Sequence, residues 1–364
     1  MNTILNEVSV STPGRICLFG EHQDYLGLPV IAGAINRRIT VSAKRRNDKI
    51  IHFRLPDIHE KESFFLQECI PYKKERDYLR SVVNIVQRQG FQLSSGLDCK
   101  ITGSIPINSG TSSSTALVVA LTDVMIRMSE GSREISAEKV AKLAHQAEVV
   151  EFKEPGGMMD HYATALGGVI FLALYPQVKI EKLHTDLKSF VLGDSGKPKN
   201  TKKILSKVKM RIENTVLQLK KNYKSFSLHT LHYDDINRVH KYINDDQFDL
   251  LKATIKNRDL TGKAKEVFSA SHLNHKRIGD LLYKHHLILS RKLDISTPQI
   301  DRMIEAALQA GAYGAKINGS GGGGCMFAYA PGKTEEVAEA IVKKGGKCYI
   351  IDIDEGTRTE KIVY

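Results

Sequence analysis

The sequence predicts an α+β protein built from two mixed α/β domains. Strand-like and helix-like segments alternate along its 364 residues, a length for which about two domains is the usual expectation. Hydrophobic residues make up 41% of the chain and charged residues 26%, as in globular proteins that fold in water. A basic segment begins near 185–195, so the expected division is 1–190 and 191–364.

The individual elements follow from hydrophobic periodicity. Residues 29–55 alternate and carry β-branched side chains, which predicts two strands joined by a polar turn at 45–48. Further strands are predicted at 99–106, 167–174, 324–329 and 347–353. Apolar residues at helical spacing predict helices at 76–89, 115–128, 136–152, 202–221, 235–256, 261–288, 298–310 and 334–344. Pro13-Gly14 is expected to form a turn.

Composition excludes several protein classes. No apolar run approaches the ~20 residues of a membrane helix, and the N-terminus lacks a basic region before an apolar core. Neither a membrane span nor a secretory signal is therefore expected. The five cysteines are scattered, without a C-x-x-C pair, which indicates reduced thiols of a cytoplasmic protein.

The net charge of +12 has a local source. Residues 197–224 hold ten Lys or Arg and one acidic residue, Glu213. Such a segment could attract a nucleotide, an acidic sugar or nucleic acid. A solvated helix face is the favoured interpretation, because only Tyr223 and Phe226 could stack on bases there.

The segment 11–25 is the most informative part of the chain. It places four ionisable groups within ten positions, beside apolar residues: Arg15, Glu21, His22 and Asp24. A turn at Pro13-Gly14 needs none of these groups. Donors, acceptors and charges at the rim of an apolar strand suit a polyhydroxy ligand, with a charged surface turn as the alternative.

A second motif predicts a phosphate cradle at the start of a buried helix. A glycine is followed by small hydroxyl residues: Gly110, Thr111, Ser112, Ser113, Ser114 and Thr115. Free N–H groups and the helix dipole favour an anion there, and the hydroxyls offer a Mg²⁺ ligand. The motif is not a P-loop, and a serine-rich helix cap is the alternative.

Two further patterns complete the set. The glycines at 319–324 match G-x-G-x-x-G, but a strand rather than a helix should follow, so a dinucleotide fold is rejected and close backbone approach is expected. Glu148 and Asp160 flank a glycine turn at 156–157. One carboxylate could hold Mg²⁺ and the other accept a hydroxyl proton, as phosphoryl transfer requires.

Together, the ordered motifs resemble the GHMP small-molecule kinase superfamily, and most closely its galactokinases. Residues 13–25 are similar to P-G-R-V-N-L-I-G-E-H-T-D-Y, and residues 110–116 to the G-L-S-S-S-A phosphate loop. Residues 157–160 are similar to G-I-M-D, and residues 312–325 match the family's glycine loop. The resemblance implies an N-terminal domain like ribosomal protein S5 domain 2 and a ferredoxin-like C-terminal domain.

The resemblance also implies an ATP- and Mg²⁺-dependent sugar 1-kinase. Asp160 would face the anomeric hydroxyl, and Arg15 would stabilise the attacking oxygen and the transferred phosphoryl group. Sugar hydroxyls would be held by Glu21, His22, Asp24 and Gly157. Ser113 and Glu148 would ligate Mg²⁺. The expected partners are galactose, or a closely related monosaccharide, and ATP, with neither nucleic acid nor a membrane involved.

Three departures from the galactokinase pattern bear on the substrate. Leu26-Gly27-Leu28 replaces a glycine pair, and His161 replaces a glutamine. Residues 193–201 are more similar to mevalonate-type kinases, and lysines there could favour an acidic sugar. The alternatives are a GHMP kinase for a uronic acid, a pentose, another hexose or mevalonate, or a non-catalytic sugar sensor or nucleic-acid binder.

Overall fold

Strand β1 (Glu7–Phe19) lies inside the larger of two sheets in the computed structural model, which describes residues 5–106, 109–130, 135–187, 189–198 and 201–364. It pairs antiparallel with β2 (Val30–Arg45) on one side and β12 (Arg358–Val363) on the other. From β2 the sheet continues through β5 (Leu97–Gly103) and β3 (Ile50–Leu55) to β4 (Glu60–Phe65). The first residues of β2 also pair with β6 (Val169–Ala173), which pairs with β7 (Lys179–Leu183).

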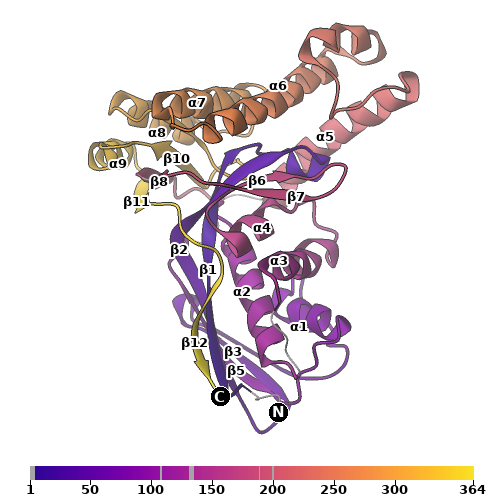
Figure 1. Cartoon of the computed structure of the whole chain (residues 1–364), viewed down its shortest axis with the longest axis vertical. Coiled ribbons are helices and arrows are strands. Elements are labelled where there is room, and N and C mark those ends of the chain that lie inside the picture. Colours follow the sequence, from indigo (N-terminus) through magenta and orange to yellow (C-terminus); the bar gives the residue numbers. More distant parts are fainter. Residues whose placement is uncertain (1–4, 107–108, 131–134, 188, 199–200) are drawn as a thin grey trace.

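Four helices lie on one side of this sheet (Figure 1). They are α1 (Tyr78–Arg88), α2 (Ser113–Met128), α3 (Ala137–His145) and α4 (Met159–Leu166). Helix α2 is buried along most of its length and packs on β1 and β2. A π-helical turn, Gln146–Val150, extends α3 and carries Glu148. These helices cover one face of the larger sheet, and on that face α2 and α4 can reach the end of β1.

The smaller sheet is antiparallel, in the order β11 (Lys347–Ile351), β8 (Phe190–Asp194), β10 (Cys325–Tyr329) and β9 (Gly314–Ile317). Packed on it are α7 (His275–Arg291), α8 (Pro298–Gln309) and α9 (Thr334–Lys343). Ile16, Leu18 and Phe19 share a buried cluster with side chains of β8 and β10. The end of β1 is thus enclosed between the two halves of the chain.

The next three helices lie toward the upper right of Figure 1, and the last of them runs back beside α7. They are α5 (Thr201–Asn222), the 3₁₀ helix η4 (Tyr233–Tyr242) and α6 (Asp245–Phe268). A separate small core joins them, with Leu219, Phe226, Val239 and Leu251 among its buried side chains. The basic residues of α5 at 202, 203, 207, 211, 220 and 221 are exposed, in line with a solvated helix face.

The predicted mixed α/β fold is confirmed, but several boundaries are wrong. Instead of helices at 235–256 and 261–288, α6 begins where Asn244 and Gln247 form a capping box, and it ends at Phe268. It continues past 261 because Ala264 and Phe268 are buried in the core beneath β1. Pro13-Gly14 is not a turn: β1 runs through both residues, and only its register with β2 shifts there.

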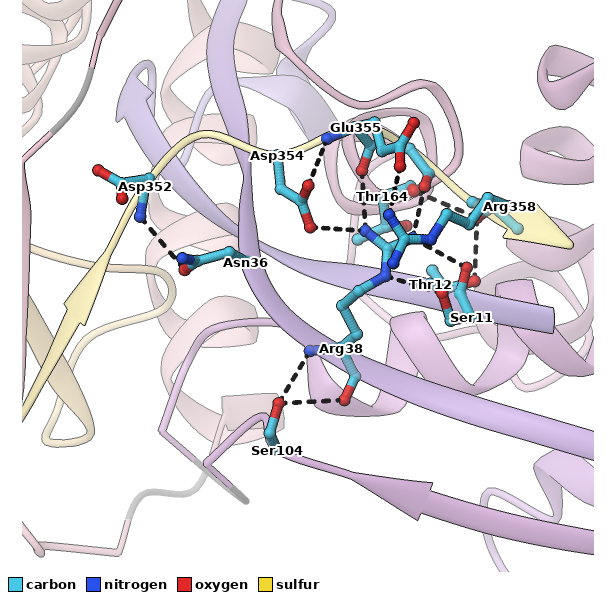
Figure 2. A network of polar contacts seen from close by, with 12 residues as sticks. Ser11, Thr12, Asn36, Arg38, Ser104, Thr164, Asp352, Asp354, Glu355 and Arg358 are labelled. Carbon is cyan, nitrogen blue, oxygen red and sulfur yellow. Dashed lines mark hydrogen bonds and ion pairs between the residues drawn. The ribbon is translucent and has the colours of Figure 1, made fainter. Parts of the chain in front are cut away.

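The last strand, β12, returns to the larger sheet, a pairing that no sequence pattern predicts. Figure 2 shows how the preceding segment is fastened to β2. The Arg38 guanidinium donates to the Asp354 carboxylate at 2.7 Å and to the backbone carbonyls of Glu355 and Gly356. Thr12 and Thr357 share a hydroxyl hydrogen bond of 2.9 Å. The expected division at 190/191 remains a prediction.

Among the described residues, no helix has the length and apolar character needed to cross a bilayer. In the described part of the chain, the five cysteines form no disulfide bond.

Candidate active site

A cavity of about 360 Å³ opens where the end of β1 meets the start of α2 and the start of α4. Of the residues that the sequence singled out for the site, every one except Thr111 lines it. From the sugar and catalytic motifs these are Arg15, Glu21, His22, Asp24, Gly157 and Asp160. From the phosphate and metal motifs they are Gly110, Ser112, Ser113, Ser114, Thr115 and Glu148.

Asp160 and Arg15 form a bidentate pair within this cavity. Arg15 Nε and Nη2 lie 2.8 Å from Oδ1 and Oδ2 of Asp160, and Ser112 Oγ donates to Oδ2 at 2.6 Å. Burial opposes ionisation of Asp160, but the charge and hydrogen bonds of Arg15 outweigh it and lower the pKa of the carboxyl. Asp160 is therefore an ionised hydrogen-bond acceptor suited to orienting a hydroxyl, rather than a strong base.

The phosphate motif lies beside this pair. Arg15 Nη1 donates to the carbonyl of Gly110, so one guanidinium spans Asp160 and the loop. Ser112 has a left-handed backbone (φ 61°), and α2 begins at the next residue with its first-turn amides at the cavity. The hydroxyl of Ser112 is already committed to Asp160. Thr111 is fully buried and bonds Ser109 at 2.7 Å, so its side chain faces inward.

Asp24 sits against the glycine turn that precedes α4. Its carboxylate accepts backbone N–H groups from Tyr25 (2.9 Å) and Met159 (3.3 Å). A Cβ at Gly157 would lie 2.1 Å from Oδ2 of Asp24, so only glycine allows this approach. Burial, followed by the negative charge of Asp160, raises the pKa of Asp24 from 3.8 to about 6.

This shift predicts a pH dependence of stability. The folded protein holds the Asp24 proton more tightly than the unfolded chain, so this contribution is complete below about pH 4 and is lost as the pH rises through about 6. Asp24→Asn removes the titration. We expect the urea midpoint of Asp24→Asn, measured relative to that of wild type, to be higher at pH 7 than at pH 4. A constant difference would show that Asp24 has an ordinary pKa.

His22 and Glu21 occupy the other wall. His22 Nδ1 lies 2.9 Å from the Tyr25 hydroxyl, and Nε2 lies 3.1 Å from the carbonyl of Ser320. Glu21 is 1% exposed, and its Oε1 accepts a hydrogen bond from the ammonium of Lys316. Its Oε2 lies 3.7 Å from His285 Nε2 and has no hydrogen-bond donor.

Glu148 is a buried carboxylate that fits a divalent cation. Its Oε2 lies 2.9 Å from Nε2 of His161, but the two atoms are not aligned for a hydrogen bond, so that oxygen lacks a donor. Carboxylate and hydroxyl oxygens, which Glu148 and Ser113 contribute to the lining of this cavity, are ligands that Mg²⁺ prefers. No cluster of three or more His, Cys, Asp or Glu suited to a metal occurs in the described part of the chain. Phosphate oxygens and water would therefore complete the coordination.

Sequence reasoning missed several cavity residues. Arg76 forms a bidentate pair with Glu154, with distances of 2.9 and 2.6 Å, although the two residues stand 78 positions apart. Leu205 reaches the cavity from α5, and Tyr78 from α1. Other lining residues that were not assigned to the site stand within or beside the sequence motifs: Tyr25, Gly156, Met159, His161, Gly319 and Ser320.

Of the two remaining motifs, the glycine loop reaches the cavity through Gly319 and Ser320, and residues 195–197 lie behind that loop. A Cβ at Gly319 would lie 2.9 Å from the carbonyl of Gly110, so the expected close backbone approach of the glycine loop is present, and β10 follows the loop as predicted. Residues 195–197 bond this loop: Ser195 Oγ donates to the Gly324 carbonyl at 2.7 Å. Neither Ser195 nor Lys197 lines the cavity, and Lys199 lies outside the described residues.

Comparison with known proteins places this site in a family. The model "GHMP kinases N terminal domain" matches residues 77–168, and "GHMP kinases C terminal" matches residues 267–349. A mevalonate kinase of Thermococcus sibiricus is 30% identical over 370 residues, covering 98% of this chain and 99% of its own. The chain belongs to the GHMP kinase family. The predicted family and fold are thereby confirmed, and with them ATP as the phosphoryl donor and an alcohol as the acceptor.

Three further comparisons concern galactokinases. The model "Galactokinase galactose-binding signature" matches residues 5–45 of this GHMP kinase. A galactokinase of Actinobacillus succinogenes is 26% identical, covering 92% of this chain and 88% of its own. The structure of Lactococcus lactis galactokinase complexed with galactose superposes with a TM-score of 0.85 at 22% identity, covering 97% of this chain and 95% of that one.

Proposed function

We propose that this GHMP kinase transfers the terminal phosphoryl group of MgATP to the anomeric hydroxyl of galactose or a closely related neutral monosaccharide, in the cytoplasm. The observation that carries the proposal is the charge of the cavity. Five carboxylates line it: Glu21, Asp24, Glu148, Glu154 and Asp160. Its two guanidiniums, Arg15 and Arg76, are each engaged by one of these carboxylates.

This charge pattern favours a neutral polyol over an acidic acceptor. Carboxylates accept hydrogen bonds from hydroxyl groups. An acceptor that itself carries a carboxylate would be repelled by them, and its own negative charge would stay unpaired. No lysine is among the described residues that line the cavity. The match of residues 5–45 to the galactose-binding signature supports the same acceptor.

In the proposed reaction, Asp160 accepts a hydrogen bond from the anomeric hydroxyl and turns its oxygen toward the phosphate loop. Arg15 is fixed between Asp160 and Gly110, where negative charge would build up during transfer. Glu21, His22 and Asp24 hold the other hydroxyls. Loop 110–115 would hold the phosphates, with Ser113 and Glu148 on Mg²⁺. Bound MgATP would supply the phosphoryl group and the cation that neutralises its oxygens.

Mevalonate is the second candidate, because the curated relatives at 30% identity are named mevalonate kinases. A panel of galactose, galacturonate and mevalonate, each with MgATP and an assay of ADP release, separates the candidates. We expect turnover with galactose and none with the two acids. Binding to a random oligonucleotide without turnover of any acceptor would instead favour a non-catalytic role.

The metal assignment makes a separate prediction. Glu148→Gln should raise the Mg²⁺ concentration needed for half-maximal activity and leave the KM for the acceptor unchanged, because a carboxamide oxygen carries no charge for the cation. Glu151→Gln is the matched control, since that carboxylate binds Arg88 and lies outside the cavity. An unchanged Mg²⁺ requirement in Glu148→Gln would make Glu148 a structural residue only.

A further inference from the structure

Lys316 has no exposed surface and stands in β9 of the smaller sheet. In sequence it is far from the segment 11–25, which carries Glu21, His22 and Asp24 and is called the sugar motif below. Its ammonium donates to the carbonyls of Cys17 at 2.9 Å and Ile317 at 2.8 Å, and to Oε1 of Glu21. These contacts use all three donors of the ammonium group. The Glu21 carboxylate is therefore held from the other half of the chain.

Two neighbours of Lys316 make contacts of the same kind. Asn318 accepts the Cys17 N–H at 2.9 Å and donates to the Gly110 carbonyl at 3.0 Å. The carbonyl of Ser320 lies 3.1 Å from Nε2 of His22. Residues 316–320 thus fasten the end of β1, the sugar motif and the phosphate loop to one another.

We propose that Lys316 is a positioning residue for the acceptor: it fixes the Glu21 carboxylate and the Cys17 carbonyl, and so sets the position of the sugar motif at the cavity. The inference deepens the proposed function and rests on it. Glu21 lines the cavity, and Oε2 is buried without a hydrogen-bond donor. That oxygen lies 3.7 Å from Nε2 of the buried His285, so the hydrogen bond from Lys316 to Oε1 is the contact that holds the carboxylate in place.

Stability alone gives no reason for an ion pair at this place. A buried pair can be exchanged for apolar residues of similar volume without loss, and often with a gain. Lys316 instead couples the position of Glu21 to the smaller sheet, which also carries Asn318 and the glycine loop. Acceptor specificity would then depend on a residue almost 300 positions outside the sugar motif.

The test compares Lys316→Met, Glu21→Gln and the double variant with wild type. Lys343→Met serves as the control, because that lysine is exposed on α9. Lys316→Met should lower kcat/KM for the acceptor by about 10²-fold, the loss that a misplacement of about 1 Å can cause, and leave the KM for ATP unchanged. Because both side chains act through one carboxylate, the double variant should lose no more than Glu21→Gln.

Each alternative outcome overturns the inference. If folded Lys316→Met keeps a normal kcat/KM, the lysine only neutralises a buried charge. If the losses add in the double variant, Lys316 acts independently of Glu21. Should Lys316→Met fail to fold, Lys316→Arg keeps the charge and displaces the carboxylate; a normal KM for the acceptor in that variant rejects positioning.

Failure of the proposed function is recognised separately. The acceptor panel is run first on wild type, and the variants are measured with whichever compound is phosphorylated, so turnover of mevalonate leaves the Lys316 test intact. If no compound is turned over, amide hydrogen exchange at residues 17–24 replaces kinetics. Faster exchange there in Lys316→Met, relative to Lys343→Met, supports positioning, and unchanged exchange overturns it.

Discussion

Asp160→Asn is expected to fold, to bind MgATP, and to lose ~10²–10⁴ in kcat, the range that a side chain positioned at the proton of the reacting hydroxyl contributes. The carboxylate is held by Arg15 from two nitrogens and by Ser112. An asparagine can keep one of the bonds to Arg15 but presents an N–H₂ group in place of the second oxygen. The acceptor hydroxyl then loses the ionised partner that orients it. Single-turnover phosphorylation, with nucleotide affinity measured in parallel, gives the comparison.

Asp123→Asn is the matched control for this variant. Asp123 is also buried, and its carboxylate accepts a hydrogen bond from Arg127 at 3.0 Å, but on α2 outside the cavity. Loss of that carboxylate should affect stability and leave kcat close to that of wild type. Near wild-type kcat in Asp160→Asn would remove Asp160 from the mechanism.

Gly157→Ala should lower kcat/KM for the acceptor by about 10²-fold and leave nucleotide binding intact. The added methyl group would lie 2.1 Å from Oδ2 and 2.2 Å from Cγ of Asp24, too close for any van der Waals contact. Asp24 must therefore move, and it takes with it a carboxylate that is proposed to hold a sugar hydroxyl. Isothermal titration with the acceptor and, separately, with a nucleotide measures the two effects.

Gly156→Ala tests whether this loss is specific. A Cβ at Gly156 meets only Val149 Cγ2, at 3.6 Å, which is an ordinary contact. Both variants add one methyl group to the same turn and reduce its flexibility equally. They differ mainly in that only the methyl group at position 157 would overlap Asp24. Equal losses of acceptor affinity in the two variants would attribute the effect to the turn rather than to Asp24.

The parts of the site that could be predicted from sequence are those carried by contiguous motifs. Arg15, Asp24 and Asp160 stand in short segments whose residue types already suggest their chemistry, and the structure brings them together around one cavity. Arg76 and Glu154 lacked such a context. Each is a single charged residue among other polar residues, a pattern that is typical of exposed segments. Their pairing depends on how α1 packs beside the π-helical turn.

The same reasoning explains the errors in the fold. The sequence pattern detected α1 because Leu79, Val82, Val83 and Val86 recur at helical spacing, and α2 because it is apolar and buried along most of its length. It did not detect β12, whose residues are mostly exposed and whose place is set by pairing with β1, nearly the whole chain away. Lys316 lies within the glycine-loop motif at 312–325, but no role could be predicted for it, because its partner Glu21 lies 295 positions earlier.

The most direct test of the proposed galactose 1-kinase activity is to incubate the wild-type protein with MgATP and equal concentrations of galactose, galacturonate and mevalonate, and to identify the products by ³¹P NMR. The cavity with five carboxylates and two engaged guanidiniums predicts a single phosphorylated product, galactose with its phosphate on the anomeric oxygen. Phosphorylated mevalonate with unchanged galactose would contradict the proposal, while leaving the membership of the GHMP kinase family untouched.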